Sequence, residues 1–153
     1  MKKIIALILV LASVFALCAC GGPFGSSSSK YGDQDKFLSD MAQGINDRLS
    51  FDEDESKMNA DELSAQYLKC VGAELDQIEK YENVTFSDPK FNQIAHEYIA
   101  ACQMQRTAAE NYRNKDFYDR VYFGARTVRY GIIAYLYENY NLPLSSEVAS
   151  LYS

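Results

Sequence analysis

The side chains that could perform acid–base or metal chemistry are few, and their spacing argues against catalysis. His96 is the only histidine in the 153 residues. A di-iron helical bundle needs a Glu-x-x-His pair on one helix, but Gln93 occupies the position three residues before His96. Its place beside Glu97 favours a histidine at the rim of a helix face over a catalytic base. We therefore expect no metal site and no cofactor.

Two cysteines of the main domain could act as nucleophiles beside His96. Cys70 and Cys102 both fall at core positions of predicted helices, however, and buried thiols are inert. An antiparallel pairing of their helices would place the two cysteines opposite one another in a core contact. A disulfide bond between them stays open, because helix axes roughly 8 to 10 Å apart often keep the Cα atoms too far apart to bond. We expect no catalytic residues and no enzymatic activity.

Carboxylates offer two further candidates. The run from Asp52 to Glu55 resembles the start of a calcium loop, but Lys57 and Leu63 then stand where an EF-hand needs a glycine and a bidentate acid. The run is better interpreted as a solvated acidic loop. Glu74 lies on the flank of a helix face, where an ion pair with an arginine of a later helix, or a contact with Tyr98, is favoured over an acid of raised pKa.

Charge is distributed unevenly along the chain. Acidic residues dominate residues 33 to 97, whereas residues 98 to 140 contain more bases than acids. One interpretation is that arginines of the second half pair with the acidic first half. The other is an anion or glycan site in which arginines and tyrosines alternate. The arginines concerned are Arg106, Arg113, Arg120, Arg126 and Arg129.

The elements that must position these residues are all predicted to be helices. From residue 33 onward, apolar residues recur at helical spacing and no long strand-like alternation occurs. We predict helices over about 34–50, from a cap at Asn59 to about 82, over about 89–113, and from a break at 114–116 to about 141. This pattern predicts an all-α, four-helix up-down-up-down bundle with a short C-terminal helical tail.

The last long helix is apolar on two sides. Its predicted core stripe holds Phe117, Val121, Val128, Ile132 and Tyr135. Candidate binding residues on the opposite face are Tyr122, Arg126, Tyr130, Tyr137 and Tyr140. Three alternatives remain for what covers that face: the tail at 144–153, a protein partner or second copy, and a glycan or other small ligand.

The start of the chain indicates export. Lys2 and Lys3 precede an apolar run that ends at Leu17. Leu17 and Ala19 stand three and one residues before Cys20, so this stretch resembles the lipobox of bacterial lipoproteins. The resemblance implies that residues 1–19 are a signal peptide, that Cys20 carries the lipid, and that the protein is anchored on the extracytoplasmic face of the cell membrane.

Beyond the lipobox, residues 20–32 read as a flexible Gly/Ser linker and residues 33–153 as one helical domain. The domain is similar to uncharacterised small helical lipoprotein domains of Gram-positive-type bacteria. A net charge of −6 argues against nucleic acid as a partner. We expect a non-catalytic binding or interaction module with an envelope protein partner or a homodimer. The alternative is a lipoprotein that binds a glycan or anion for a transporter or cell-wall enzyme.

Overall fold

The computed structural model describes residues 31–51 and 55–152. The predicted signal peptide, the predicted lipidation site Cys20 and the predicted linker up to residue 30 lie outside the described residues, as do residues 52–54 of the acidic loop. Gly32, the last residue of the predicted linker, donates its N–H to the carbonyl of Thr85 at 2.8 Å. The end of the linker is therefore already attached to the domain.

The described part of the chain is helical and contains no strand, which confirms the all-α prediction. Its five α-helices are α2 (Gln34–Ser50), α3 (Ala60–Ile78), α4 (Pro89–Glu110), α5 (Lys115–Tyr140) and α6 (Ser146–Ala149). Three 3-10 turns accompany them: η2 (Glu55–Lys57), η3 (Glu79–Tyr81) and η4 (Ser150–Tyr152). No helix in these segments is both long and apolar enough to cross a bilayer.

Polar caps fix where each long helix begins. Asp33, Asn59, Asp88 and Asn114 each accept backbone N–H groups of the first turn that follows. Asn59 and Glu62 form the predicted capping box, and Pro89 follows Asp88 at a position where its missing N–H costs nothing. Asn141 ends α5 in the left-handed conformation, with φ 55°.

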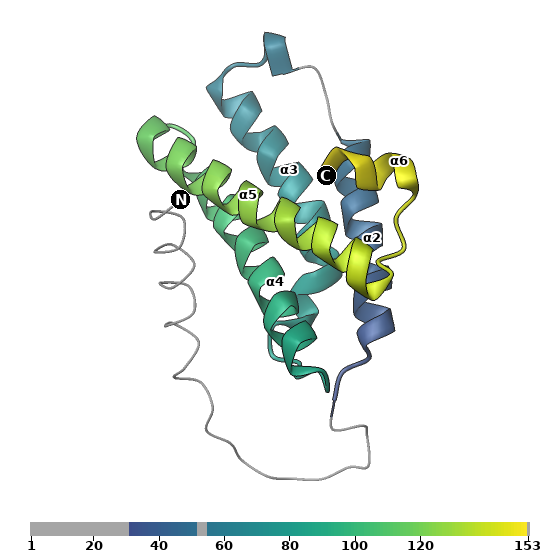
Figure 1. Cartoon of the computed structure of the whole chain (residues 1–153). Helices are drawn as coiled ribbons and strands as arrows, with labels where there is room; N and C mark the ends of the chain where they lie inside the picture. Colours follow the sequence, from purple (N-terminus) through teal and green to yellow (C-terminus); the bar gives the residue numbers. More distant parts are fainter. Residues whose placement is uncertain (1–30, 52–54, 153) are drawn as a thin grey trace, which may run out of the picture.

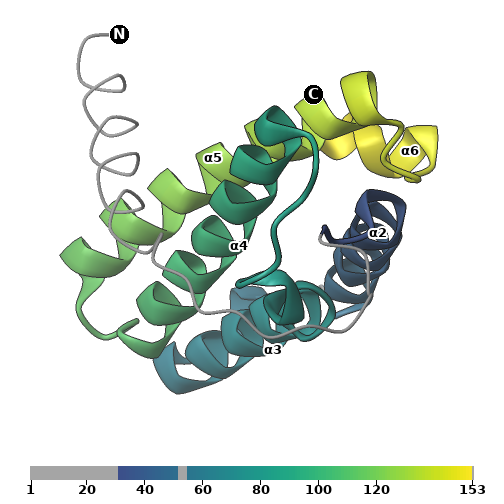
Figure 2. The ribbon, with the colours of Figure 1, turned by 90° about the horizontal axis from the view of Figure 1, so that it is seen from below.

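Helices that follow one another in the chain pack side by side. α2 contacts α3, α3 contacts α4, and α4 contacts α5. Figure 1 shows α5 running obliquely across α4, and Figure 2 shows α2 and α3 on one side of the molecule with α4 and α5 on the other. Both views place α6 at the end of α5, on the side of α2.

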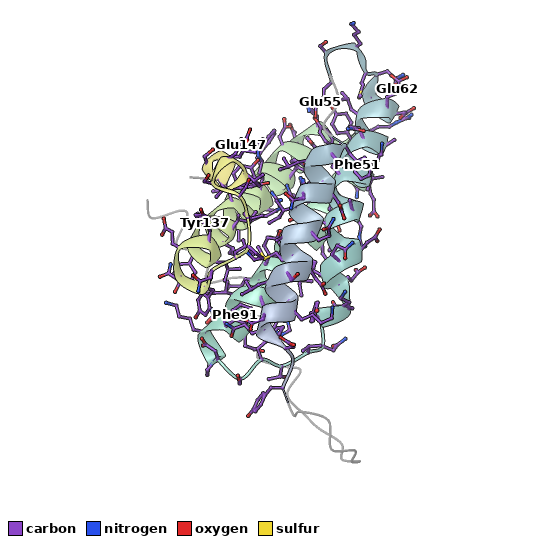
Figure 3. The ribbon with its side chains drawn as sticks, turned by 90° about the vertical axis from the view of Figure 1, so that its right-hand side faces the viewer. Phe51, Glu55, Glu62, Phe91, Tyr137 and Glu147 are labelled. Atoms are coloured by element: carbon purple, nitrogen blue, oxygen red, sulfur yellow. The ribbon has the colours of Figure 1, made fainter. Side chains whose placement is uncertain are left out.

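One end of the core is aromatic. Phe37 of α2 is fully buried, and its ring meets those of Tyr81, Phe86 and Phe91 edge to face at centroid distances of 5.2 to 5.6 Å. Figure 3 shows Phe91 near the end of the molecule opposite to Phe51 and Glu55. The polar residues described below occupy the other part of the interior.

The buried face of α5 differs from the predicted stripe. Phe117, Val121, Val128 and Tyr135 are only half-buried, whereas Ile132 is buried. The buried face follows the neighbouring helical row, which contains Tyr118, Tyr122, Ala125, Arg129, Ile132, Ile133 and Leu136. The predicted face was wrong because a charged residue, Arg129, occupies the centre of the true core row and interrupts its apolar pattern.

The C-terminal segment folds back onto α5. Leu144, Ala149 and Tyr152 are buried, and the ring of Tyr152 meets that of Tyr130 edge to face at 4.8 Å. The predicted tail thus covers part of the face. Leu151, the neighbour of Tyr152 in the chain, is 56% exposed.

Candidate functional site

A buried cluster of charges lies where α2, α3, α4 and α5 converge. The Glu74 side chain is fully buried. Arg129 Nε donates to its Oε1 at 2.7 Å and its Oε2 at 2.9 Å, and Arg48 Nη1 donates to Oε2 at 2.8 Å. Tyr98 also donates its hydroxyl to Oε1. The predicted pairing of Glu74 with Tyr98 and an arginine of a later helix is confirmed.

The cluster is ionised. Burial alone would raise the pKa of Glu74, but the charges and hydrogen bonds of Arg129 and Arg48 outweigh burial and hold this pKa below its ordinary value. Burial would likewise lower the pKa of Arg129, and the adjacent Glu74 carboxylate raises it instead. The two arginines therefore favour the carboxylate form of Glu74 over the protonated form.

Arg48 extends the cluster toward solvent. Its Nη1 also donates to Gln105 Oε1 at 3.2 Å, and its Nη2 donates to the hydroxyl of Tyr122 at 3.1 Å. Two buried donors of the described residues lack an acceptor, namely Gln105 Nε2 and Arg129 Nη2. Buried polar groups are nearly always paired, so these two donors need an explanation.

A pocket of about 320 Å³ opens beside this cluster. The end of α2, η2, the middle of α3, residues 118–130 of α5 and η4 form it, and Arg48, Arg126 and Arg129 all line it. Its volume lies at the lower end of the range of small-molecule sites, roughly 300 to 1,000 Å³. The pocket could therefore accommodate a small ligand beside three guanidinium groups.

Tyrosine rings form much of the pocket wall. The rings of Tyr118 and Tyr122 stack at 4.8 Å, and Tyr67 stacks on Tyr118 at 5.6 Å. Tyr130 and Tyr152 line another part of the wall. Burial raises the pKa of Tyr118 and of Tyr122 above the ordinary value, so both hydroxyls are neutral donors at neutral pH.

The structure brings together only some of the predicted binding residues. Tyr122, Arg126 and Tyr130 all line the pocket. Tyr140 instead packs its ring on Phe91 at 5.3 Å and hydrogen-bonds to the side chain of Asp88 at 3.0 Å. Tyr137 does not line the pocket and is 37% exposed; Figure 3 shows it well away from Glu55, which does line it.

Three further residues that the sequence singled out, Cys70, Cys102 and His96, lie in packed or hydrogen-bonded positions. No disulfide bond joins Cys70 and Cys102; Cys102 is buried, and Cys70 is half-buried at the pocket wall. Their helices have the predicted antiparallel register, since Ser64 Oγ donates to the Ala109 carbonyl at 2.8 Å, but the direct contact between the cysteines stays a prediction. His96 Nε2 lies 3.0 Å from the Val84 carbonyl, which ties α4 to the preceding loop.

The ion pairs support the first interpretation of the charge asymmetry, in which arginines of the second half pair with the acidic first half. Arg106 pairs with Glu79, Arg113 with Asp61, and Arg129 with Glu74, so three of the five do contact the acidic first half. Arg126 has its guanidinium over the ring of Tyr130 at 4.9 Å and adds its charge to the pocket.

Several pocket residues escaped the sequence analysis. Arg48 ends an amphipathic helix, where a basic residue complements the helix dipole, and that position gave no sign of burial. Tyr67 had the spacing of an ordinary core residue, and Tyr118 lay outside the predicted core stripe. The available signal was the repeat of buried-type residues at 118, 122, 125, 129, 133 and 136, which required accepting an arginine in the core row.

The described residues contain no group of three or more His, Cys, Asp or Glu side chains placed to hold a metal ion. No family model, no curated protein and no solved structure matches this chain.

Proposed function

We propose that this protein is a lipid-anchored, extracytoplasmic lipoprotein whose helical domain binds a small molecule in the arginine–tyrosine pocket without transforming it. The observation that carries the binding role is the pocket of about 320 Å³ lined by five tyrosines and three arginines. The lipobox-like residues before Cys20 support the anchor. Such a protein would hold or present its ligand at the membrane surface for a transporter or a cell-wall enzyme.

The finer architecture belongs to the same proposal. We infer that α2 to α5 form an up-down-up-down bundle, with α6 and η4 as a tail that completes the pocket through Tyr152. Support comes from the packing of consecutive helices on one another and from the contact of Tyr152 with Tyr130. Residues 33–153 would then be one binding domain, held off the membrane by the linker.

A protein partner or a second copy is the other candidate. Its support is a set of exposed apolar side chains near the pocket and along α5, namely Phe123, Tyr137 and Leu151. A filled interior with an aromatic outer patch would favour this role, whereas a tyrosine-lined pocket favours a small ligand. The pocket therefore places the small ligand first.

The binding role is tested with matched tyrosine variants. The melting temperature of the purified full chain in detergent micelles is measured with each compound of a library of monosaccharides, amino acids and small aromatic metabolites. We expect at least one compound to raise the melting temperature of the wild type and of Tyr137→Ala, but not of Tyr130→Ala. Both tyrosines lie on α5, and only Tyr130 lines the pocket. Equal responses of the two variants would contradict the role of the pocket.

The anchor is tested separately. Cys20→Ala should leave the membrane fraction and lose incorporation of a labelled fatty acid, while Cys18→Ala should retain both. A Cys20→Ala protein that still partitions with membranes would refute the lipid anchor.

A further inference from the structure

Arg129, one of the residues that line the pocket, has a buried cationic donor without an acceptor among the described residues. Arg129 is only 1% exposed, and its Nε is fully engaged by the two oxygens of Glu74. Its Nη2 is buried and unpaired among the described residues. Guanidinium groups match the geometry of planar anions such as carboxylates. An anionic acceptor at this point would complete the hydrogen bonding of Arg129.

The balance of charge around the pocket limits the ligand. Among the described residues, Arg48, Arg126 and Arg129 line it, against one lining carboxylate, Glu55, and the Glu74 carboxylate that pairs with Arg48 and Arg129. These five groups leave a single positive charge unbalanced. A bound group with one negative charge would neutralise it, whereas a dianion would leave an excess of negative charge next to buried Glu74.

The tyrosines that line the pocket indicate the chemistry of the uncharged part of the ligand. Tyr122 accepts a hydrogen bond from Arg48, so its own hydroxyl proton remains a donor at the pocket wall. The stacked rings of Tyr67, Tyr118 and Tyr122 present flat apolar surface. Flat or aromatic groups pack well against such rings, and 320 Å³ restricts them to a small molecule.

We propose that the pocket binds a small monocarboxylate with a flat apolar body, its carboxylate at Arg129 and Arg126 and its body against the tyrosine rings. This inference rests on the proposed function and specifies the class of ligand. Arg126 is exposed and makes no ion pair with a carboxylate among the described residues, so it is the group that a ligand can recruit at the mouth.

The charge requirement is tested with pairs of matched compounds. Benzoate and phenylacetate are titrated into the purified full chain by calorimetry, alongside their neutral amides, benzamide and phenylacetamide. Inorganic phosphate and phenyl phosphate serve as the dianionic arm. We expect each carboxylate to bind about ten-fold or more tightly than its amide, and phenyl phosphate to bind more weakly than benzoate, following the single unbalanced charge.

The position of the carboxylate is tested with two arginines of one helix. Arg126→Gln should weaken benzoate binding about five-fold or more, because it removes a positive charge from the pocket mouth. Arg120→Gln is the control, since Arg120 is exposed on the same helix, and its Nε donates to the Asp116 carbonyl, away from the pocket. Neither change touches the Glu74 cluster, and thermal melting of both variants verifies that they fold.

Each outcome separates this inference from the proposed function. Amides that bind as tightly as carboxylates, or an Arg126→Gln variant with unchanged affinity, would overturn the monocarboxylate inference. If phenyl phosphate bound more tightly than benzoate, the inference that the pocket balances a single negative charge would be overturned. Library compounds that still depend on Tyr130 would in those cases preserve the proposed function. If no compound in either set binds in a manner that depends on Tyr130, the proposed function fails as well.

Discussion

Glu74 is the side chain on which the interior of this domain depends most. It forms ion pairs with two arginines inside the protein, one of them fully buried. Replacing such a group by an apolar residue together with its partners can be neutral, but removing one partner leaves uncompensated buried charge. An apolar core of similar volume would have served stability at least as well, so the cluster is consistent with a binding role for the arginines it holds.

Glu74→Gln should therefore reduce the free energy of unfolding by about 3 to 5 kcal/mol. The control is Glu79→Gln, which breaks the exposed pair with Arg106 and should cost less than about 1 kcal/mol. Urea denaturation followed by circular dichroism measures both. Similar losses for the two variants would mean that the buried cluster contributes no more than a surface ion pair.

The ionised Asp40 carboxylate stabilises the domain at neutral pH, and this stabilisation is lost at acid pH. Burial would raise its pKa, but hydrogen bonds from Lys80, Tyr81 and Lys36 outweigh burial and lower the pKa from 3.8 to about 2. A lowered folded-state pKa stabilises the protein above pH 3.8, and this contribution is lost as the pH falls from 3.8 toward 2. Partial exposure of the carboxylate screens the effect to about 1 kcal/mol.

Asp40→Asn should consequently be less stable than the wild type at pH 7, and the difference should shrink as the pH falls to 2. Unfolding curves of both proteins at several pH values measure that difference. A difference that is constant from pH 7 to pH 2 would show that the Asp40 charge makes no contribution of this kind.

At the element scale, Gly44 allows α2 to lie close to α3. A Cβ atom at this position would stand 3.0 Å from both the Cα and the carbonyl oxygen of Glu74. Helix propensity alone marks Gly44 as a weak point of α2, because propensity scales say nothing about the neighbouring helix. The glycine brings α2 against the residue that anchors the charge cluster.

Gly44→Ala should thus destabilise the fold by about 1 to 3 kcal/mol, despite the better helix propensity of alanine. Gly131→Ala on α5 is the matched substitution, since nothing lies within 4 Å of its Cβ position, and it should stabilise by about 0.5 to 1 kcal/mol. Thermal melting of the two variants would contradict this account if both shifts had the same sign.

The C-terminal segment contributes through one of two adjacent side chains. Tyr152 is buried against Tyr130 and Arg129, whereas Leu151 is exposed. Tyr152→Ala should cost about 1 to 3 kcal/mol, and Leu151→Ala less than about 0.5 kcal/mol. Denaturant unfolding distinguishes them, and equal effects would mean that the tail is not docked through Tyr152.

Helix positions were predictable because caps and breaks are local signals. Asp33, Asn59 and Asp88 begin helices where the sequence places them, and α2 has the predicted bounds. The buried face of α5 was not predictable from hydrophobic period, since Arg129 stands in its core row. Which arginine becomes buried depends on where Glu74 lies across the interior. That position is determined by the packing of the helices, not by the local sequence.

At the scale of the whole molecule, the sequence predicted the all-α class and part of the site. Tyr122, Arg126 and Tyr130 were selected because α5 is too apolar for a surface helix, and they do line one pocket. Tyr137 and Tyr140 belonged to the same pattern but lie elsewhere, since α5 is long enough to cross the pocket and continue past it. The sequence did not predict that Arg48 and Tyr67 line the pocket, because this depends on how α2 and α3 pack against the other helices.

The most direct test of pocket binding is NMR of the full chain labelled at the tyrosine rings. The compound that raises the melting temperature most is titrated in, and assigned ring signals are followed. Binding in the pocket predicts saturable shifts for Tyr122, Tyr130 and Tyr152, with Tyr31 and Tyr137 unchanged. Shifts confined to Tyr31 and Tyr137, or equal shifts for all five, would contradict it.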